Sequence, residues 1–122
     1  MGVVRTLFAA WASLVLASPL HARNPEHLFA TCAGRLSALT EFQWLTDGPA
    51  SEQTARERDA MVSLAEAAAP PETLPHLISW RVNAKAAQAA LLQRAAFGHD
   101  PKGISPRRAE RLVAACRALL LG

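Results

Sequence analysis

The chain has 122 residues, of which 51% are apolar, with no tyrosine and a formal net charge of +3. This length predicts a single domain, and the abundance of alanine and leucine favours helices over strands because these side chains lose little freedom in a helix. A charge this small does not indicate nucleic-acid binding, which requires a strongly basic surface.

The first 22 residues have the pattern of a secretory signal peptide. Arg5 is their one basic residue, and an apolar core follows over about residues 7–17. Signal peptides have apolar cores of ~7–15 residues, followed by a small residue at the cleavage site. Ala22 is the first choice for that site and Ala17 is the second.

A retained membrane anchor is the alternative for this segment. A membrane span needs ~20 consecutive apolar residues, and Pro19 and His21 interrupt this run. We therefore expect a helical domain over residues 23–122 that is periplasmic or secreted and has no stable membrane span after the leader is removed. Loss of Arg5 with the leader lowers the positive charge by one unit.

Start and stop signals mark four helical segments in the remaining chain. Capping residues and proline at the first helical position predict where a helix begins. Glycine or proline beyond the last turn predicts where a helix ends. No stretch has the alternation of a strand, and no internal repeat is present. The expected helices span about residues 25–46, 51–69 and 106–120, and a third helix that begins near residue 72 or 75 ends at residue 97.

The predicted N-caps are Asn24, Ser51 and Ser105, before the first, second and fourth helices. The breaks are "DGP" at 47–49, the two prolines at 70–71 and a Gly/Pro-rich loop before Ser105. Four helices joined by short loops predict an all-α fold, a small antiparallel up-down-up-down four-helix bundle.

The two cysteines, Cys32 and Cys116, are predicted to form one disulfide between the first and fourth helices. Each lies on the apolar stripe of its helix, one near a helix start and the other near a helix end, so antiparallel neighbours bring them to the same level. Gly34 allows two backbones to approach closely beside Cys32. The stripes contain Leu28, Cys32, Leu36 and Leu39 in the first helix, and Leu112, Val113, Cys116, Leu119 and Leu120 in the fourth.

An oxidising compartment favours such a pair as a structural staple. In the chain-entropy account, a disulfide that closes nearly the whole domain contributes ~4–4.7 kcal/mol, a large part of a total stability of ~5–15 kcal/mol. The alternative is a redox-active or metal-binding thiol pair, which the spacing does not support because no CxxC is present.

Polar residues interrupt the apolar faces of three helices. Buried charges must pair or reach water, and Glu57 with Arg81 or Arg35 is the first pairing expected. Two interpretations remain open: a structural ion pair, and an anion-binding cleft between helices. The cluster proposed for either is Arg35, Glu57, Arg81 and Lys85, and the uncharged polar residues on these faces are Gln43 and Gln88.

Trp44 lies off the main stripe of the first helix and also has two interpretations. It packs under the turn at residues 45–50, or it is exposed and marks a partner surface. The C-terminal quarter is basic, which fits either a solvated face or contact with an anionic envelope surface or an acidic partner. Its basic residues are Lys102, Arg107, Arg108, Arg111 and Arg117.

No motif indicates catalysis or a cofactor. The chain has no CxxCH, no glycine-rich phosphate loop, no HExxH and no GxSxG. Met61 with His76 or His99 is the one candidate set for haem or copper, and no spacing supports it. We therefore expect no metal, no cofactor and no enzymatic activity.

The sequence thus predicts an exported, non-catalytic binding or accessory protein of the cell envelope that contacts an unknown protein partner or the anionic envelope surface. The alternative is a carrier of a small ligand or anion that uses a polar cleft between helices.

Overall fold

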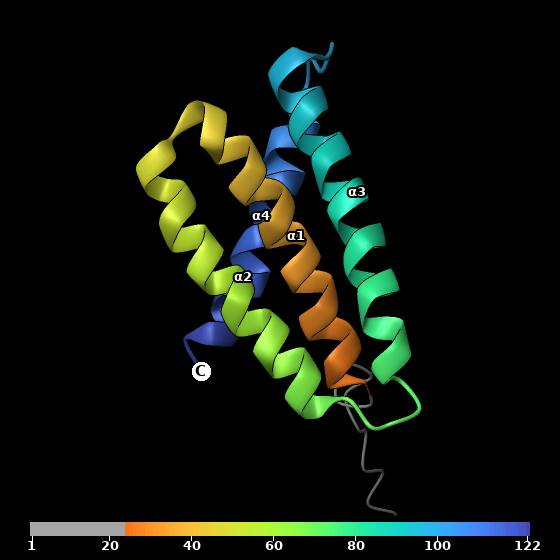
Figure 1. Cartoon of the computed structure of the whole chain (residues 1–122). Helices are drawn as coiled ribbons and strands as arrows, with labels where there is room; N and C mark the ends of the chain where they lie inside the picture. Colours follow the sequence, from red (N-terminus) through yellow and green to blue (C-terminus); the bar gives the residue numbers. More distant parts are fainter. Residues whose placement is uncertain (1–23) are drawn as a thin grey trace, which may run out of the picture.

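The computed structural model describes residues 24–122, and the predicted leader at 1–22 lies outside them. The described part is all-α and has the predicted up-down-up-down order (Figure 1). A 3-10 turn, η2 (Leu74–His76), precedes the third helix. The helices are α1 (Pro25–Thr46), α2 (Gly48–Ala68), α3 (Leu77–Phe97) and α4 (Ile104–Leu120).

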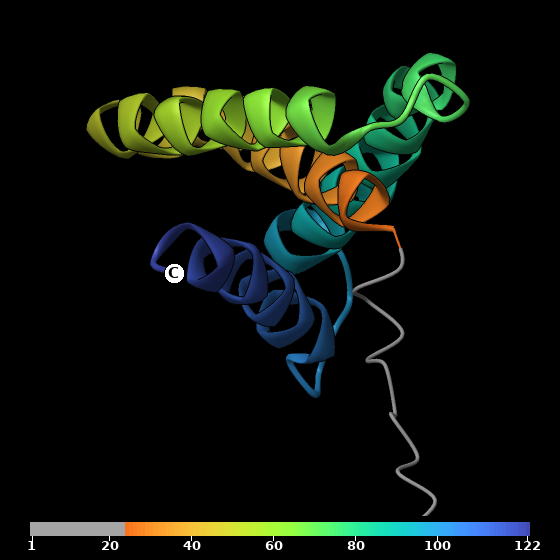
Figure 2. The ribbon, with the colours of Figure 1, turned by 90° about the horizontal axis from the view of Figure 1, so that it is seen from below.

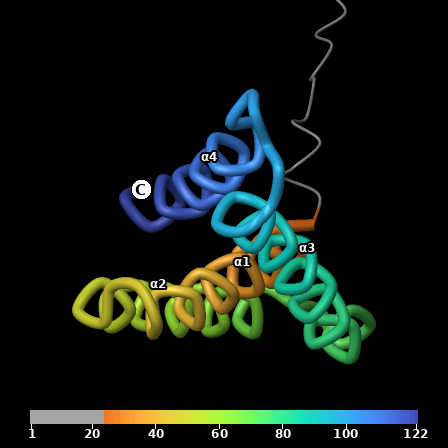
Figure 3. The backbone as a smooth tube through the Cα atoms, turned by 90° about the horizontal axis from the view of Figure 1, so that it is seen from above, coloured from red at the N-terminus to blue at the C-terminus, as the bar shows by residue number. Residues whose placement is uncertain are grey.

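Helix α1 lies at the centre of the bundle. It packs along α2 on one side and along α3 on another, and α4 meets α3 and a shorter part of α1. Seen along the bundle, α2 and α3 diverge from α1, and α4 crosses on the remaining side (Figures 2 and 3). Of the three outer helices, the fourth is therefore the least extensively packed against the central one.

Two helices begin earlier than their predicted caps. Helix α2 begins at Gly48, and Asp47 caps it because its Oδ1 accepts from the Ala50 amide at 3.3 Å. The "DGP" sequence is therefore a one-residue break and a cap, and Ser51 is not the cap. Asn24 precedes α1 as predicted, but its side chain forms no capping hydrogen bond.

The cap of α4 comes from the loop before it. The Asp100 carboxylate accepts from the backbone amides of Ile104 at 3.1 Å and Ser105 at 2.6 Å. The predicted cap, Ser105, instead lies inside the first turn of a helix that begins at Ile104. Gly103 precedes the helix at φ 61°, in the left-handed region that glycine adopts without strain.

The disulfide between Cys32 and Cys116 is present, as predicted. The two Cα atoms are 5.4 Å apart, and the bridge spans 84 residues of sequence. Both cysteines are fully buried, and they join a core cluster that also contains Leu36, Met61 and Val113. The bridge therefore joins α4 to α1 within the main apolar core.

Gly34 lies where α1 crosses α3, not where it crosses the disulfide partner α4. A Cβ at this position would collide with the Arg81 carbonyl oxygen and lie 2.9 Å from both the Ala84 Cβ and the Lys85 amide nitrogen. The predicted close approach is therefore correct, but the helix that approaches is the third one.

The central position of α1 explains why its sequence is not cleanly amphipathic. Ser37 and Thr40 are buried on it, and each hydroxyl donates to the carbonyl oxygen four residues earlier at 2.7 Å. Such bonds satisfy a buried hydroxyl within its own helix. Both hydroxyls are therefore satisfied within α1 itself, and the Ser37 hydroxyl also accepts a hydrogen bond from Arg81 of α3.

Candidate functional site

Glu57 pairs with Arg117 of α4, and not with Arg81 or Arg35 as the helix faces predict. The Arg117 Nε lies 2.8 Å from the Glu57 Oε2, and its Nη2 donates to the Thr54 hydroxyl at 3.1 Å. The Glu57 side chain is 11% exposed. This polar bridge connects α4 to α2, whereas the predicted pairings connect α2 to α1 or α3.

Arg81 and Lys85 connect α3 to α1. The Lys85 Nζ lies 2.5 Å from a Glu41 carboxylate oxygen, and the Arg81 Nη2 donates to the Ser37 hydroxyl at 3.4 Å. Arg35 lies elsewhere, with its Nη1 4.0 Å from the Cys116 Sγ. The structure therefore does not bring the predicted cluster of Arg35, Glu57, Arg81 and Lys85 together in one cleft.

Trp44 is exposed, with 62% of its surface accessible, so it does not pack under the turn that follows it. Leu45 beside it is 90% exposed, and Phe97, at the end of α3, is 86% exposed. Both helices end at the same end of the bundle (Figure 1). Arg107, Arg108 and Arg111 of the basic C-terminal quarter are also exposed, as a possible partner surface requires.

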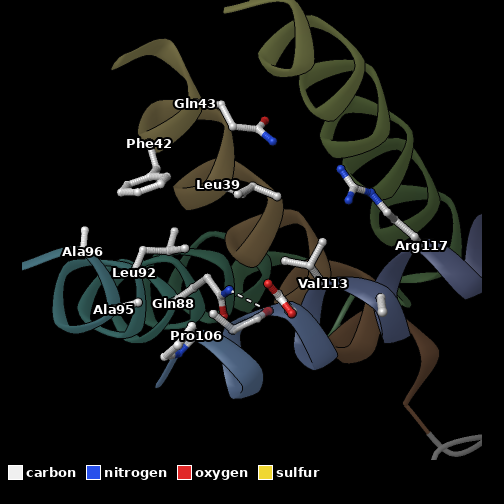
Figure 4. A pocket seen from close by; sticks show the side chains of 13 residues that line it. Leu39, Phe42, Gln43, Gln88, Leu92, Ala95, Ala96, Pro106, Val113 and Arg117 are labelled. Atoms are coloured by element: carbon white, nitrogen blue, oxygen red, sulfur yellow. Dashed lines mark hydrogen bonds between the residues drawn. The ribbon is translucent and has the colours of Figure 1, made fainter. Parts of the chain in front are cut away.

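The most prominent hollow is a groove between α1, α3 and α4, with a volume of about 510 Å³. Figure 4 shows side chains from the three helices around this space. Small side chains leave the space open, because alanines of α3 and α4 face it where leucines would fill it. Its apolar lining includes Leu39, Phe42, Leu92, Ala95, Ala96, Pro106, Ala109, Val113 and Ala114.

Gln88 is the buried polar residue on this groove, with 1% of its surface exposed. Its Nε2 donates to the Ala109 carbonyl oxygen at 3.2 Å, the dashed bond in Figure 4. Because a carbonyl can only accept, this bond determines which amide atom faces α4. The other atom, Oε1, accepts no hydrogen bond from residues 24–122.

Gln43, one turn from the end of α1, contributes a second acceptor of this kind. Its Oε1 is buried and accepts no hydrogen bond from the described part of the chain. An unpaired buried acceptor costs ~1–3 kcal/mol. Two residues that line this groove therefore each have a buried amide oxygen without a hydrogen-bond partner among residues 24–122.

The charged residues of the groove are Glu110 and Arg117. Arg117 is already paired with Glu57, and Glu110 is exposed at the rim. Among residues 24–122, no group of three or more histidine, cysteine, aspartate or glutamate side chains is arranged to hold a metal ion. The groove is therefore mainly apolar, and its one arginine is already paired with a carboxylate.

Sequence reasoning missed this groove, although it noticed the signal for it. Gln43 and Gln88 each interrupt an apolar stripe. A polar side chain at such a position is expected to be buried, where its amide can lack a hydrogen-bond partner. The charged residues on the same helix faces, Arg35, Arg81 and Lys85, led instead to the prediction of an ion cluster. An alanine-rich face on α3 is the second signal, because small side chains cannot fill the space between diverging helices.

Comparison with known proteins finds no protein-family profile, no curated protein sequence and no solved structure that matches this chain. Over residues 24–122, none of the helices is both long enough and apolar enough for a membrane span.

Proposed function

We propose that the protein is a small exported, non-catalytic binding protein that holds a small, mostly apolar molecule in the groove between α1, α3 and α4. The observation that carries this proposal is a mainly apolar groove of about 510 Å³, whose lining includes Gln43 and Gln88, each with a buried amide oxygen that has no hydrogen-bond partner among residues 24–122. Small-molecule sites have volumes of ~300–1,000 Å³ with mainly apolar linings and a few polar groups.

The lining indicates the chemistry of the ligand. The apolar skeleton of the ligand covers the side chains of Leu39, Leu92 and Val113 and removes their surfaces from water. One or two N–H or O–H groups on that skeleton donate to the amide oxygens of Gln43 and Gln88. The pairing of Arg117 with Glu57 leaves no free positive charge for an anion in this groove.

The disulfide supports the exported location. A bridge of this kind persists in the periplasm or outside the cell, where thiols are oxidised, and is rare where glutathione keeps them reduced. The predicted leader at residues 1–22 points to the same compartment.

The test uses N-phenyl-1-naphthylamine, an apolar probe with one N–H donor whose fluorescence rises in apolar sites. We expect saturable binding to the full chain. Ala114→Phe fills the groove and should weaken binding about tenfold or more, which is ~1.4 kcal/mol. The matched control is Ala115→Phe, because Ala115 is exposed on the same helix and does not line the groove.

A second probe tests the role of the amide oxygens. 1-Benzylnaphthalene has nearly the same shape as the first probe but no N–H donor. We expect it to bind the native chain several-fold more weakly, because it leaves the Gln43 and Gln88 oxygens unpaired. Equal loss of binding in the two phenylalanine variants, or equal affinity for the two probes, contradicts the proposal.

The second candidate function is contact with a partner protein through the exposed residues at the end of the bundle. The observation that favours it is the exposure of Trp44, Leu45 and Phe97, since tryptophan is enriched at interfaces. A pull-down from the envelope fraction with the native chain and with Trp44→Ser tests it. A partner captured equally well by both chains would exclude this surface.

A further inference from the structure

A second hollow, of about 350 Å³, collects arginines from three different helices. Arg35 of α1, Arg94 of α3 and Arg108 of α4 line it, together with Thr31. It shares Gln88 with the apolar groove and no other lining residue. The two hollows are therefore separate sites.

The charge in this arginine hollow is not balanced by the described part of the chain. No carboxylate lines the hollow, and none of its three arginines forms an ion pair within residues 24–122. By contrast, Arg58, Lys85 and Arg117 each have a carboxylate within 2.9 Å. Like charges held close together repel unless an anion lies between them.

Arg35 is the least exposed of the three arginines. It is half-buried, and burial together with the charge of Arg108 lowers the pKa of its guanidinium. A partly buried charge is screened less by solvent than an exposed one, so it attracts an anion more strongly.

We propose that this arginine hollow binds a phosphate group. Each guanidinium group can donate two parallel hydrogen bonds to phosphate oxygens. Three guanidinium groups favour a phosphate dianion over a carboxylate, because the carboxylate carries only one negative charge. Thr31 adds a hydroxyl donor to the lining. The volume accommodates a phosphate with a small organic group, as in a free phosphomonoester or a lipid headgroup.

The first experiment titrates inorganic phosphate and glycerol phosphate into the full, oxidised chain at constant ionic strength, with chloride as the reference anion. We expect saturable shifts of the side-chain Nε–H resonances of Arg35, Arg94 and Arg108. Arg94→Gln and Arg108→Gln should each weaken binding about tenfold, since each removes a charge-assisted hydrogen bond. Both residues are exposed, so neither substitution disturbs the core.

The matched control is Arg111→Gln, which removes the same charge from α4 outside the hollow. It should change the affinity for phosphate less than about twofold. If Arg111→Gln weakens binding as much as Arg108→Gln does, the attraction is diffuse and the proposal is overturned. Binding of N-phenyl-1-naphthylamine should be unchanged by Arg108→Gln, so the two sites are tested independently.

Vesicles distinguish the source of the phosphate. Sedimentation with phosphatidic acid vesicles, lost in Arg108→Gln and competed by glycerol phosphate, assigns the site to a lipid headgroup. Saturable binding of glycerol phosphate without sedimentation assigns it to a free phosphomonoester. Phosphatidylcholine vesicles are the control, because their headgroup is zwitterionic. Absence of saturable binding in both experiments overturns the proposal.

Discussion

At the scale of single residues, Gly34 has the least room for a side chain among the glycines of residues 24–122. A methyl group at this position meets the backbone of α3 at Arg81 and Lys85, which cannot move aside as a flexible side chain could. The identity of this residue therefore determines how closely α1 and α3 approach.

Gly34→Ala should destabilise the protein by ~1–3 kcal/mol, the usual cost of overpacking a tight contact. An alanine in a helix otherwise adds ~0.5–1 kcal/mol of stability relative to glycine. Gly48→Ala is the control, since no atom lies within 4 Å of the Cβ it adds. Urea unfolding measures both variants, and equal stability of the two would contradict the packing argument.

Asp100 is a second residue with a defined role, because its carboxylate caps α4. Its pKa is held below the ordinary value of 3.8 by hydrogen bonds from the backbone and side chain of Ser105, then from the amide of Ile104, with Arg107 adding to the effect. Partial desolvation opposes these hydrogen bonds.

A lowered folded pKa means that the cap stabilises the protein above pH 3.8 and loses this contribution as the pH falls through the folded pKa. In Asp100→Asn, the free energy of unfolding should therefore fall less steeply as the pH is lowered below 3.8 than it does in the native chain. Thermal unfolding across this range, with carboxyl NMR titration of the native chain, checks the prediction. An equally steep fall in the variant would exclude Asp100 as its source.

At the scale of elements, α4 is held by the disulfide to α1, by its contact with α3, and by the Arg117 bridge to α2. The bridge includes a Glu57 carboxylate that is 11% exposed and an arginine that is 40% exposed. An interaction with one exposed partner contributes less than a fully buried pair.

A double-mutant cycle with Arg117→Met and Glu57→Gln should give a coupling free energy of ~0.5–1 kcal/mol in urea unfolding. The control cycle uses Arg58 and Asp59, an ion pair between sequence neighbours on α2 whose aspartate is exposed. The coupling of this control pair should be near zero, because solvent screens an exposed ion pair. A coupling for Arg117 and Glu57 no larger than this control would show that the bridge does not hold α4.

At the scale of the whole molecule, the disulfide compensates for a small core. The buried apolar residues are few and many are alanines, so the area removed from water is modest for a domain of this length. The bridge between Cys32 and Cys116 spans 84 residues, so it limits the conformational freedom of the unfolded chain over most of the domain.

Cys116→Ser should lower the free energy of unfolding by ~4 kcal/mol in the chain-entropy account and lower the melting temperature markedly. A reductant should destabilise the native chain by a similar amount and leave the variant unchanged. Thermal unfolding with and without dithiothreitol measures both effects. If the melting temperature is the same in all four samples, the bridge is not a staple.

The sequence by itself determined the helices and the bridge. Caps, prolines and apolar stripes act along the chain, so the number and approximate extent of the helices, their antiparallel order and the pairing of Cys32 with Cys116 could be predicted from local signals. From sequence, Ser51 and Ser105 are the predicted caps, whereas Asp47 and Asp100 cap these helices. Each aspartate lies three to five residues before the amides that it binds, and a serine closer to the helix start is an equally good candidate from sequence.

Only the tertiary structure decided which helix is central and which side chains meet. With α1 in the middle, Glu57 of α2 faces Arg117 of α4, and neither Arg81 nor Arg35. The divergence of the outer helices then leaves Gln43 and Gln88 on an open groove. The periodicity of a helix predicts that a side chain points inward. The residue that this side chain contacts depends on how helices far apart in sequence cross, and packing determines those crossings.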